Sequence, residues 1–138
     1  GHRPGVTIYG TDYPTPDGTG VRDFVHVQDL AEAHVLALDY LCAGGNSETL
    51  NVGYGQGFSV REVLETMSKV SGRKFEILEA QRRSGDLASV VTNPNRIREL
   101  LDWKPQFNNL ETICKTAYEW EIKNRHAHAL TQIEQGTL

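Results

Sequence analysis

Residues 6–33 read VTIYGTDYPTPDGTGVRDFVHVQDLAEA and predict a strand, a turn-rich loop, a second strand and the start of a helix. Apolar and β-branched residues predict the first strand over residues 6–9 and the second over residues 23–27. Between them, residues 11–20 hold two prolines, two aspartates and two glycines, which predict a loop. Because short strands and helices go on alternating through the chain, we expect an α/β fold.

Capping signals mark the predicted helices. Asp29, with Glu32 three residues later, predicts a capping box for a helix that ends at glycines 44 and 45. Ser59 and Glu62 predict a second capping box, and Gly72 ends that helix. Two more helices are expected after Asn93-Pro94 and from Asn109, with short strands at residues 49–53, 75–78 and 88–92. Helical periodicity is lost near residue 125, so residues 125–138 are predicted to be a loose tail.

Length and charge narrow the class of protein. With 138 residues the chain has room for one ordinary domain. Its net charge of −4 argues against a general nucleic-acid binder, whereas residues 73–98 are locally basic and suit one small anion. No apolar run approaches the ~20 residues that span a bilayer, so no membrane partner is expected. Cys42 and Cys114 lie on predicted apolar helix faces, and we expect two buried, reduced thiols and a cytoplasmic protein.

A glycine-rich stretch and the histidines were considered as sites. Residues 53–57 contain three alternating glycines before a helix, but their spacing differs from the dinucleotide fingerprint, so a structural turn is favoured. His26 is interpreted as a structural residue, and the pair His126 and His128 lacks companions for a metal site. Trp103 and Trp120 are interpreted as core residues.

Arginines in two loops are the strongest candidates for anion binding. The guanidinium of Arg22, which follows a flexible loop, suits bidentate capture of a phosphate, although a surface pair with a nearby aspartate is an alternative. Arg82 and Arg83 repel each other unless an anion lies beside them. Asp86 either neutralises one of them or accepts hydrogen bonds from sugar hydroxyls. Together, the two loops suggest a diphosphate clamp.

Several motifs in the same order resemble a known family. They are residues 9–27, DLAEAH at 29–34, NVG at 51–53, GFSV at 57–60, RRSGDL at 82–87, WKP at 103–105 and the EW of 119–120. Over roughly residues 4–124, the sequence resembles the C-terminal portion of the UDP-glucose 4-epimerases, which are extended short-chain dehydrogenases/reductases. In that family NAD accepts a hydride from carbon 4 of the sugar, and the hydride returns to the other face of the 4-keto sugar.

The resemblance implies an α/β substrate-binding portion in residues 1–124, without the N-terminal Rossmann half that holds NAD. The catalytic Tyr-x-x-x-Lys pair is absent from these residues, since no tyrosine has a lysine four positions later. We therefore expect no cofactor site and no catalytic residue in this chain, and no epimerase activity from it alone. The implied partners are a UDP-sugar, the NAD-binding domain and, for the full-length enzyme, a second copy in a homodimer. The implied role is galactose metabolism.

The resemblance also implies nine substrate-binding residues: Thr7, Ile8, Tyr9, Arg22, Phe24, Val60, Arg83, Asp86 and Val90. The first three flank uracil, the two arginines hold the diphosphate, Asp86 holds the ribose and Val60 contacts the nucleotide. Phe24 stands where the family often has tyrosine, so a hydroxyl is missing there. Val90 takes the place of a bulky tyrosine that gates the sugar pocket, and we expect N-acetylated sugars to fit as well.

Two other functions remain open from the sequence. A related nucleotide-sugar enzyme could use the same scaffold, such as a UDP-arabinose or UDP-N-acetylglucosamine 4-epimerase, a decarboxylase or a dehydratase. Alternatively, the chain could act alone as a nucleotide-sugar-binding module, with apolar helix faces, especially over residues 30–41, left uncovered.

Overall fold

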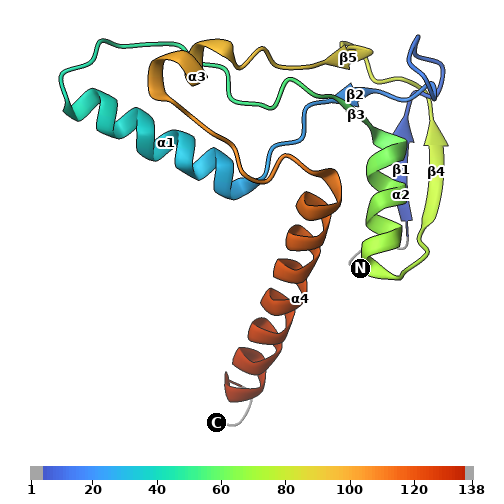
Figure 1. Cartoon of the computed structure of the whole chain (residues 1–138). Coiled ribbons are helices and arrows are strands. Elements are labelled where there is room, and N and C mark those ends of the chain that lie inside the picture. The colour runs from blue at the N-terminus through green and yellow to red at the C-terminus, as the bar shows by residue number, and fades with distance from the viewer. Residues whose placement is uncertain (1–4, 136–138) are drawn as a thin grey trace.

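The fold combines two small sheets with four helices (Figure 1). The computed structural model describes the backbone of residues 5–135 and the side chains of residues 5–124. Strand β1 (Gly5–Tyr9) pairs in parallel with β4 (Glu76–Ala80). In the second sheet, β2 (Val21–Arg22) lies between antiparallel β3 (Phe58–Ser59) and parallel β5 (Ser89–Val90). The expected α/β class is confirmed.

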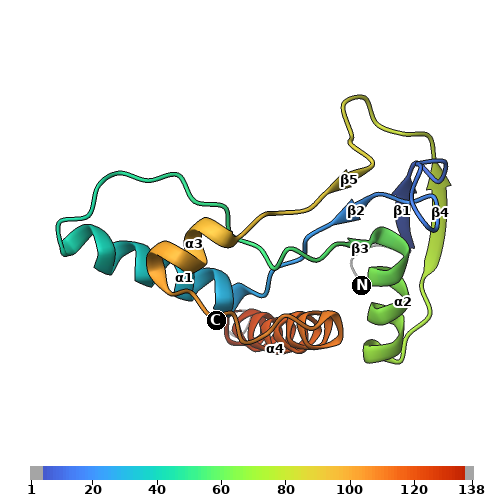
Figure 2. The ribbon, with the colours of Figure 1, turned by 45° about the horizontal axis from the view of Figure 1, so that its top comes forward.

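Helices α1 (Val27–Cys42) and α3 (Asn95–Leu101) lie together at one end of the molecule, and α2 (Val60–Ser71) lies beside β1 and β4 at the other (Figures 1 and 2). The capping box that opens α2 is confirmed, because the Ser59 side chain accepts from the Glu62 amide and the Glu62 side chain accepts from the Ser59 amide. Gly72, in the left-handed conformation, ends α2 as expected.

The start of α1 differs from the sequence prediction. Residues 23–26 follow β2 without joining a strand, and His26 rather than Asp29 caps the helix, since its side chain accepts from the Gln28 amide. Asp29 lies in the first turn and is buried, because its carboxylate binds groups far away in the sequence. The predicted strand at residues 49–53 is also irregular backbone. Long-range contacts of polar side chains have overridden the local signals here.

The core lies between α1 and α3. It is built from buried Ala33, Tyr54, Ile97, Leu101 and Trp103, and the Trp103 side chain is 1% exposed as expected. Several predicted core positions on helices are instead exposed: Leu30, Leu38, Leu41, Cys42 and Trp120. Helix α1 buries only Asp29 and Ala33, so most of its predicted apolar face meets solvent.

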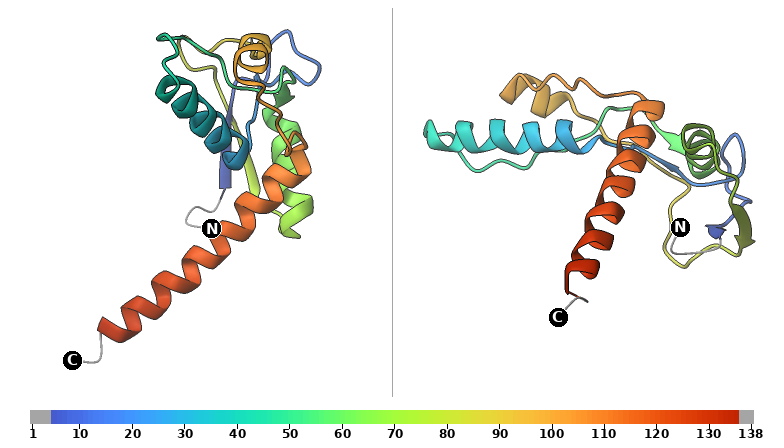
Figure 3. Two further views of the ribbon diagram at one scale, coloured as in Figure 1. Left: turned by 60° about the vertical axis from the view of Figure 1, so that its left-hand side comes forward. Right: turned by 90° about the horizontal axis from the view of Figure 1, so that it is seen from below.

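Helix α4 (Leu110–Gln135) packs its first turns near α2 and then projects away from the other elements (Figure 3). Lys69 and Glu111 join the two helices through a 2.9 Å ion pair between Nζ and Oε2. Cys114 is buried on α4, and this burial raises the pKa of its thiol. The prediction of a loose tail needs correction, because the backbone stays helical through residues 125–135. These residues include strong helix formers such as alanine, leucine, glutamine and glutamate.

Candidate functional site

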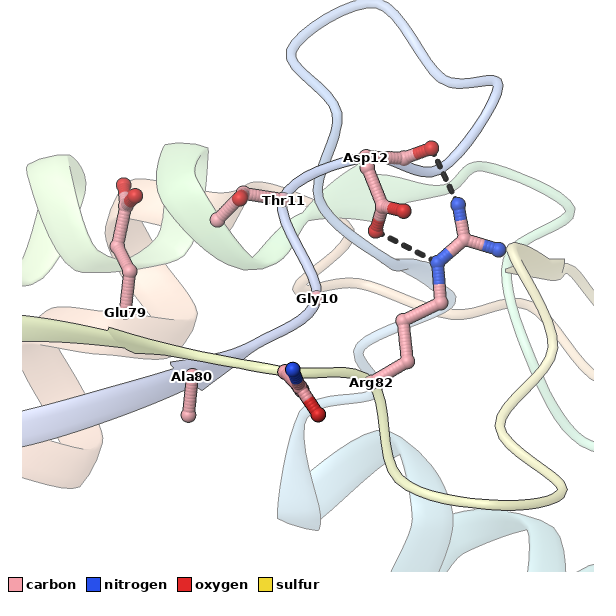
Figure 4. A pocket seen from close by; sticks show the side chains of 7 residues that line it. Gly10, Thr11, Asp12, Glu79, Ala80 and Arg82 are labelled. Carbon is pink, nitrogen blue, oxygen red and sulfur yellow. Dashed lines mark hydrogen bonds and ion pairs between the residues drawn. The ribbon is translucent and has the colours of Figure 1, made fainter.

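The parallel pairing of β1 and β4 brings two loops to the same edge of the sheet. Tyr9 is in register with Ala80, and the Gly10 amide donates to the Ala80 carbonyl at 2.8 Å. The loops that leave these strands, residues 10–20 and 81–88, therefore begin side by side. An open cleft of about 610 Å³ lies here, lined by residues 10–12 and 79–82 (Figure 4). Ligands of α/β proteins commonly bind beyond the carboxyl ends of such strands.

One group of predicted residues comes together beside this edge. The guanidinium carbon of Arg83 lies 4.8 Å from the centroid of the Tyr9 ring, and Arg83 Nε donates to Asp86 Oδ2 at 2.9 Å. Asp86 thus pairs with Arg83 in this structure. The Arg83 side chain is nevertheless 64% exposed, and the Tyr9 ring is also exposed. Both therefore present polar or aromatic surface to a ligand.

The second group surrounds β2. Arg22 is in register with Val90 on β5 and with Phe58 on β3, and the Val60 amide donates to the Gly20 carbonyl at 3.0 Å. Phe24 follows β2 and is half-buried. The Val90 side chain is 46% exposed, which fits a position that lines a binding surface.

Arg22 has no carboxylate partner among the described residues. Its Nη1 atom donates only to the Val21 carbonyl, at 2.7 Å. Neither aspartate considered as its partner is available: Asp17 accepts from Thr19 and Ser59, and Asp23 accepts from the glycine-rich turn. The anion-binding interpretation is therefore favoured over a surface ion pair for this guanidinium.

The two groups are joined by one loop. The Val21 amide donates to the Ala88 carbonyl at 2.8 Å, so residues 81–88 run from the end of β4 to the flank of β2 (Figure 2). Arg83 and Asp86 lie on this loop, while Arg22 lies beside its far end. Arg83 therefore lies within this loop, and Arg22 lies on the strand that the end of the loop meets.

Thr7 and Ile8 lie on β1 and differ in their accessibility. Thr7 is half-buried, whereas the Ile8 side chain is 1% exposed and belongs to the core. The predicted role of Ile8 at uracil is consequently restricted to its main chain, since the side chain has no free surface to offer.

The glycine-rich turn at residues 53–57 is held by a carboxylate from within the chain. Asp23 Oδ1 accepts from the Tyr54 amide at 3.1 Å, and Asp23 Oδ2 accepts from the Gly55 amide at 2.9 Å and the Thr92 amide at 3.3 Å. These donors are the groups that a phosphate would need. The turn therefore does not fit a cofactor phosphate, and we derive no cofactor chemistry from it.

Sequence analysis missed a buried polar cluster around Asp29. Its carboxylate accepts from the Tyr54 hydroxyl at 2.5 Å and from the Gln106 and Phe107 amides at 2.8 and 2.9 Å. Burial, and then the bond to Asp29, raises the pKa of Tyr54. His26 is satisfied as expected, with its ring nitrogens bonded to Gln28 and Thr116. The local sequence around Asp29 matches a capping motif and therefore does not indicate a long-range role. That role is visible only in the three-dimensional contacts.

Asp12 and Arg82 have contacts that the sequence does not predict. Arg82 Nε donates to Asp12 Oδ1 at 2.6 Å, and the Arg82 guanidinium lies 4.1 Å from the centroid of the Tyr13 ring. Figure 4 shows this side chain turned toward Asp12. The two neighbouring arginines therefore make different contacts.

Searches of the described residues for other kinds of site gave two negative results. No cluster of three or more His, Cys, Asp or Glu side chains in them could hold a metal ion. The side chains of His126 and His128 lie outside the described part. None of the described helices is long and apolar enough to cross a membrane.

Comparisons with known proteins show which proteins the chain is similar to. The model of the NAD dependent epimerase/dehydratase family matches residues 1–53. A UDP-glucose 4-epimerase of Azospirillum brasilense is 51% identical over 121 residues, which are 88% of this chain and 35% of that protein. The chain is thus homologous to NAD-dependent epimerases/dehydratases.

Solved structures make the relationship more specific. The UDP-Glc/GlcNAc 4-epimerase of Campylobacter jejuni matches with a TM-score of 0.79 and 49% identity over 88% of this chain and 36% of that one. A Stenotrophomonas maltophila UDP-glucose-4-epimerase with bound NAD and formylated UDP-arabinopyranose gives a TM-score of 0.85 and 40% identity over 91% and 37%. The chain is a relative of the UDP-glucose 4-epimerases and spans about a third of their length.

Proposed function

We propose that this chain is the C-terminal, UDP-sugar-binding portion of an NAD-dependent UDP-glucose 4-epimerase. The observation that carries the proposal is that Arg83 lies on the 81–88 loop, while Arg22 lies on β2, the strand that the end of this loop meets. Arg22 has no carboxylate partner among the described residues, and the Arg83 side chain is largely exposed. In this proposal both guanidinium groups bind the diphosphate. Asp86 gives up part of its pairing with Arg83 and accepts hydrogen bonds from the ribose hydroxyls instead. Tyr9 lies beside uracil.

Such a portion contributes to catalysis by binding rather than by bond making. When the nucleotide is held at a distance from the reacting carbon, its binding energy positions the sugar and keeps the 4-keto sugar attached while it turns over. NAD, bound by another part of the enzyme, supplies the hydride chemistry. The cytoplasmic location, the role in galactose metabolism and the homodimer implied by the resemblance belong to this proposal too.

Replacing either arginine tests the proposal. Arg22→Ala and Arg83→Ala should each weaken UDP binding by about 1.5–3 kcal/mol, the range for hydrogen bonds to charged groups. Isothermal calorimetry with UDP measures the change. Arg96→Ala is a matched control, because Arg96 pairs with Glu48 and lies outside this group of residues. Unchanged dissociation constants for both variants would remove the diphosphate clamp.

Catalysis should require more than this chain. We expect no conversion of UDP-galactose by the 138-residue protein supplied with NAD, because its turn at residues 53–57 is already occupied by Asp23 and no Tyr-x-x-x-Lys pair is present in the sequence. Product formation by the purified chain would contradict the proposed division of labour. If the isolated chain binds UDP tightly and also acts on its own in the cell, the alternative of a stand-alone nucleotide-sugar-binding module is favoured instead.

The sugar preference is proposed to depend on Val90. Its exposed, small side chain leaves more room than a tyrosine, and one similar structure is that of a UDP-Glc/GlcNAc 4-epimerase. In an epimerase that contains this sequence, Val90→Tyr should reduce turnover of UDP-N-acetylglucosamine while preserving turnover of UDP-glucose. Val91→Tyr is the matched control at the neighbouring position. Equal effects on both sugars would refute a gating role for residue 90.

A further inference from the structure

We propose that Arg82 is a positioning residue that clasps the 81–88 loop to the 10–20 loop, so that its neighbours Arg83 and Asp86 are held ready for the nucleotide. The inference rests on the proposed function. It assigns different roles to two adjacent arginines: Arg83 would contact the ligand, and Arg82 would act through the loop without touching the ligand.

The contacts of Arg82 are all internal. Nε donates to the Asp12 carboxylate, Nη2 donates to the Asp12 main-chain carbonyl, and the guanidinium plane lies over the Tyr13 ring. One side chain therefore binds the carboxylate and the carbonyl of Asp12 (Figure 4) and also an aromatic face of the same loop. A planar guanidinium can make these contacts together, whereas a lysine ammonium lacks the fork and the stacking surface.

The opposite loop is itself well anchored. Tyr13 is 6% exposed, its amide donates to the Gly18 carbonyl at 2.9 Å, and the Gly10 amide is fixed to the end of β4. Gly10 has a φ of +85°, and a Cβ there would come within 2.7 Å of Arg82 Cγ and 2.5 Å of the Tyr13 ring. Because Gly10 has no side chain, Arg82 has room to lie across the Tyr13 ring. Arg82 therefore binds a loop that is itself held by hydrogen bonds and by the burial of Tyr13.

The consequence for the site follows from chain connectivity. Arg83 is the next residue, so fixing Arg82 limits where the Arg83 main chain can go. The described contacts of Arg83 are with Asp86 in its own loop, through both side chain and main chain, and with the exposed Tyr9 ring. After Arg82, the next described main-chain hydrogen bond between this loop and another element is the one that the Ala88 carbonyl accepts from the Val21 amide. Without the clasp, residues 81–87 would span this gap with little support.

The small stability loss expected on removing Arg82 distinguishes a positioning role from a general stabilising role. The Asp12 side chain is 76% exposed and that of Arg82 41% exposed, and exposed ion pairs add little to global stability. Loss of the clasp should therefore leave the fold intact and change mainly the order of the loop and the affinity for UDP.

The test uses the full 138-residue chain with UDP as the probe. We expect Arg82→Ala to weaken UDP binding on the order of tenfold, within the range for coupled neighbouring residues. Arg82→Lys should be intermediate, and Asp12→Asn should weaken binding too. The double variant Arg82→Ala/Asp12→Asn should bind no more weakly than Arg82→Ala alone. Hydrogen exchange of residues 83–87 should become faster in Arg82→Ala, while Arg96→Ala changes neither measurement.

Other outcomes overturn the inference in distinguishable ways. If Arg83→Ala weakens UDP binding but Arg82→Ala leaves affinity and exchange unchanged, the clasp is wrong and the proposed function stands. If Asp12→Asn tightens UDP binding, Arg82 is itself a phosphate ligand rather than a positioning residue. If the wild-type chain, folded by circular dichroism, binds no UDP, the proposed function fails and the positioning role fails with it.

Discussion

Asp29 shows how much one buried residue can organise. Its carboxylate binds the Tyr54 hydroxyl and two amides of the segment before α4, while its main-chain carbonyl accepts from Trp103 Nε1 at 3.0 Å. A residue on α1 thus ties together the glycine-rich turn, the principal core tryptophan and the approach to α4. A buried charge is tolerated when its oxygens are satisfied in this way.

Replacing Asp29 with asparagine should destabilise the fold by about 3 kcal/mol. The variant removes the charge and turns an amide NH₂ toward groups that are themselves donors, so hydrogen bonds to a charged acceptor are lost. Urea unfolding followed by circular dichroism measures the free energy. Glu32→Gln is the control on the same helix, because Glu32 is exposed and should change stability by less than about 0.5 kcal/mol. Equal stability of Asp29→Asn and wild type would contradict this role.

At the scale of elements, α2 was predictable and α1 was only partly so. The Ser59–Glu62 pair is a local signal, since both partners of the capping box lie within one turn. The same spacing at Asp29 and Glu32 was misleading, because distant amides bind Asp29 more effectively than its own helix could. Likewise, residue types on α4 indicated a core position for Trp120, yet its side chain is 65% exposed. Local patterns do not reveal which packing partner is present.

The candidate site was predictable to a similar extent. The motif resemblance selected Tyr9, Arg83 and Asp86, which the structure brings together. It could not distinguish the side-chain surface of Ile8 from its main chain, because burial depends on the sheet and its covering helix. It selected Arg83 but gave Arg82 no role, since the direction of the Arg82 guanidinium depends on an acceptor 70 residues away in sequence.

The start of α2 should make stability depend on pH. Burial raises the pKa of Asp17, but hydrogen bonds from Ser59 and Thr19 outweigh it and hold the pKa below its ordinary value. Because the folded-state pKa is depressed, this stabilisation is complete above the unfolded pKa of about 4 and is lost as the pH falls through the folded pKa. The stability difference between wild type and Asp17→Asn should therefore shrink below pH 4. Urea unfolding at several pH values measures it, and a constant difference would refute the linkage.

At the scale of the whole molecule, one face of α1 exposes several apolar side chains to solvent. Val35, Leu38 and Leu41 are 53%, 60% and 52% exposed, which is a large apolar area for one helix. In the isolated chain the same area should promote self-association.

The charge-neutral double variant Leu38→Glu/Leu41→Lys should therefore reduce self-association. It places an acidic and a basic side chain one helical turn apart, where they can pair, and removes two exposed leucines without altering net charge. Light scattering at increasing protein concentration should show a lower apparent mass than for wild type. Gln28→Glu/Glu32→Gln, at exposed positions on another side of the same helix, keeps the net charge and the two leucines, so this matched control should leave the mass unchanged. A wild-type chain that stays monomeric throughout would show that this face is tolerated in water, because apolar exposure would then have no associative consequence.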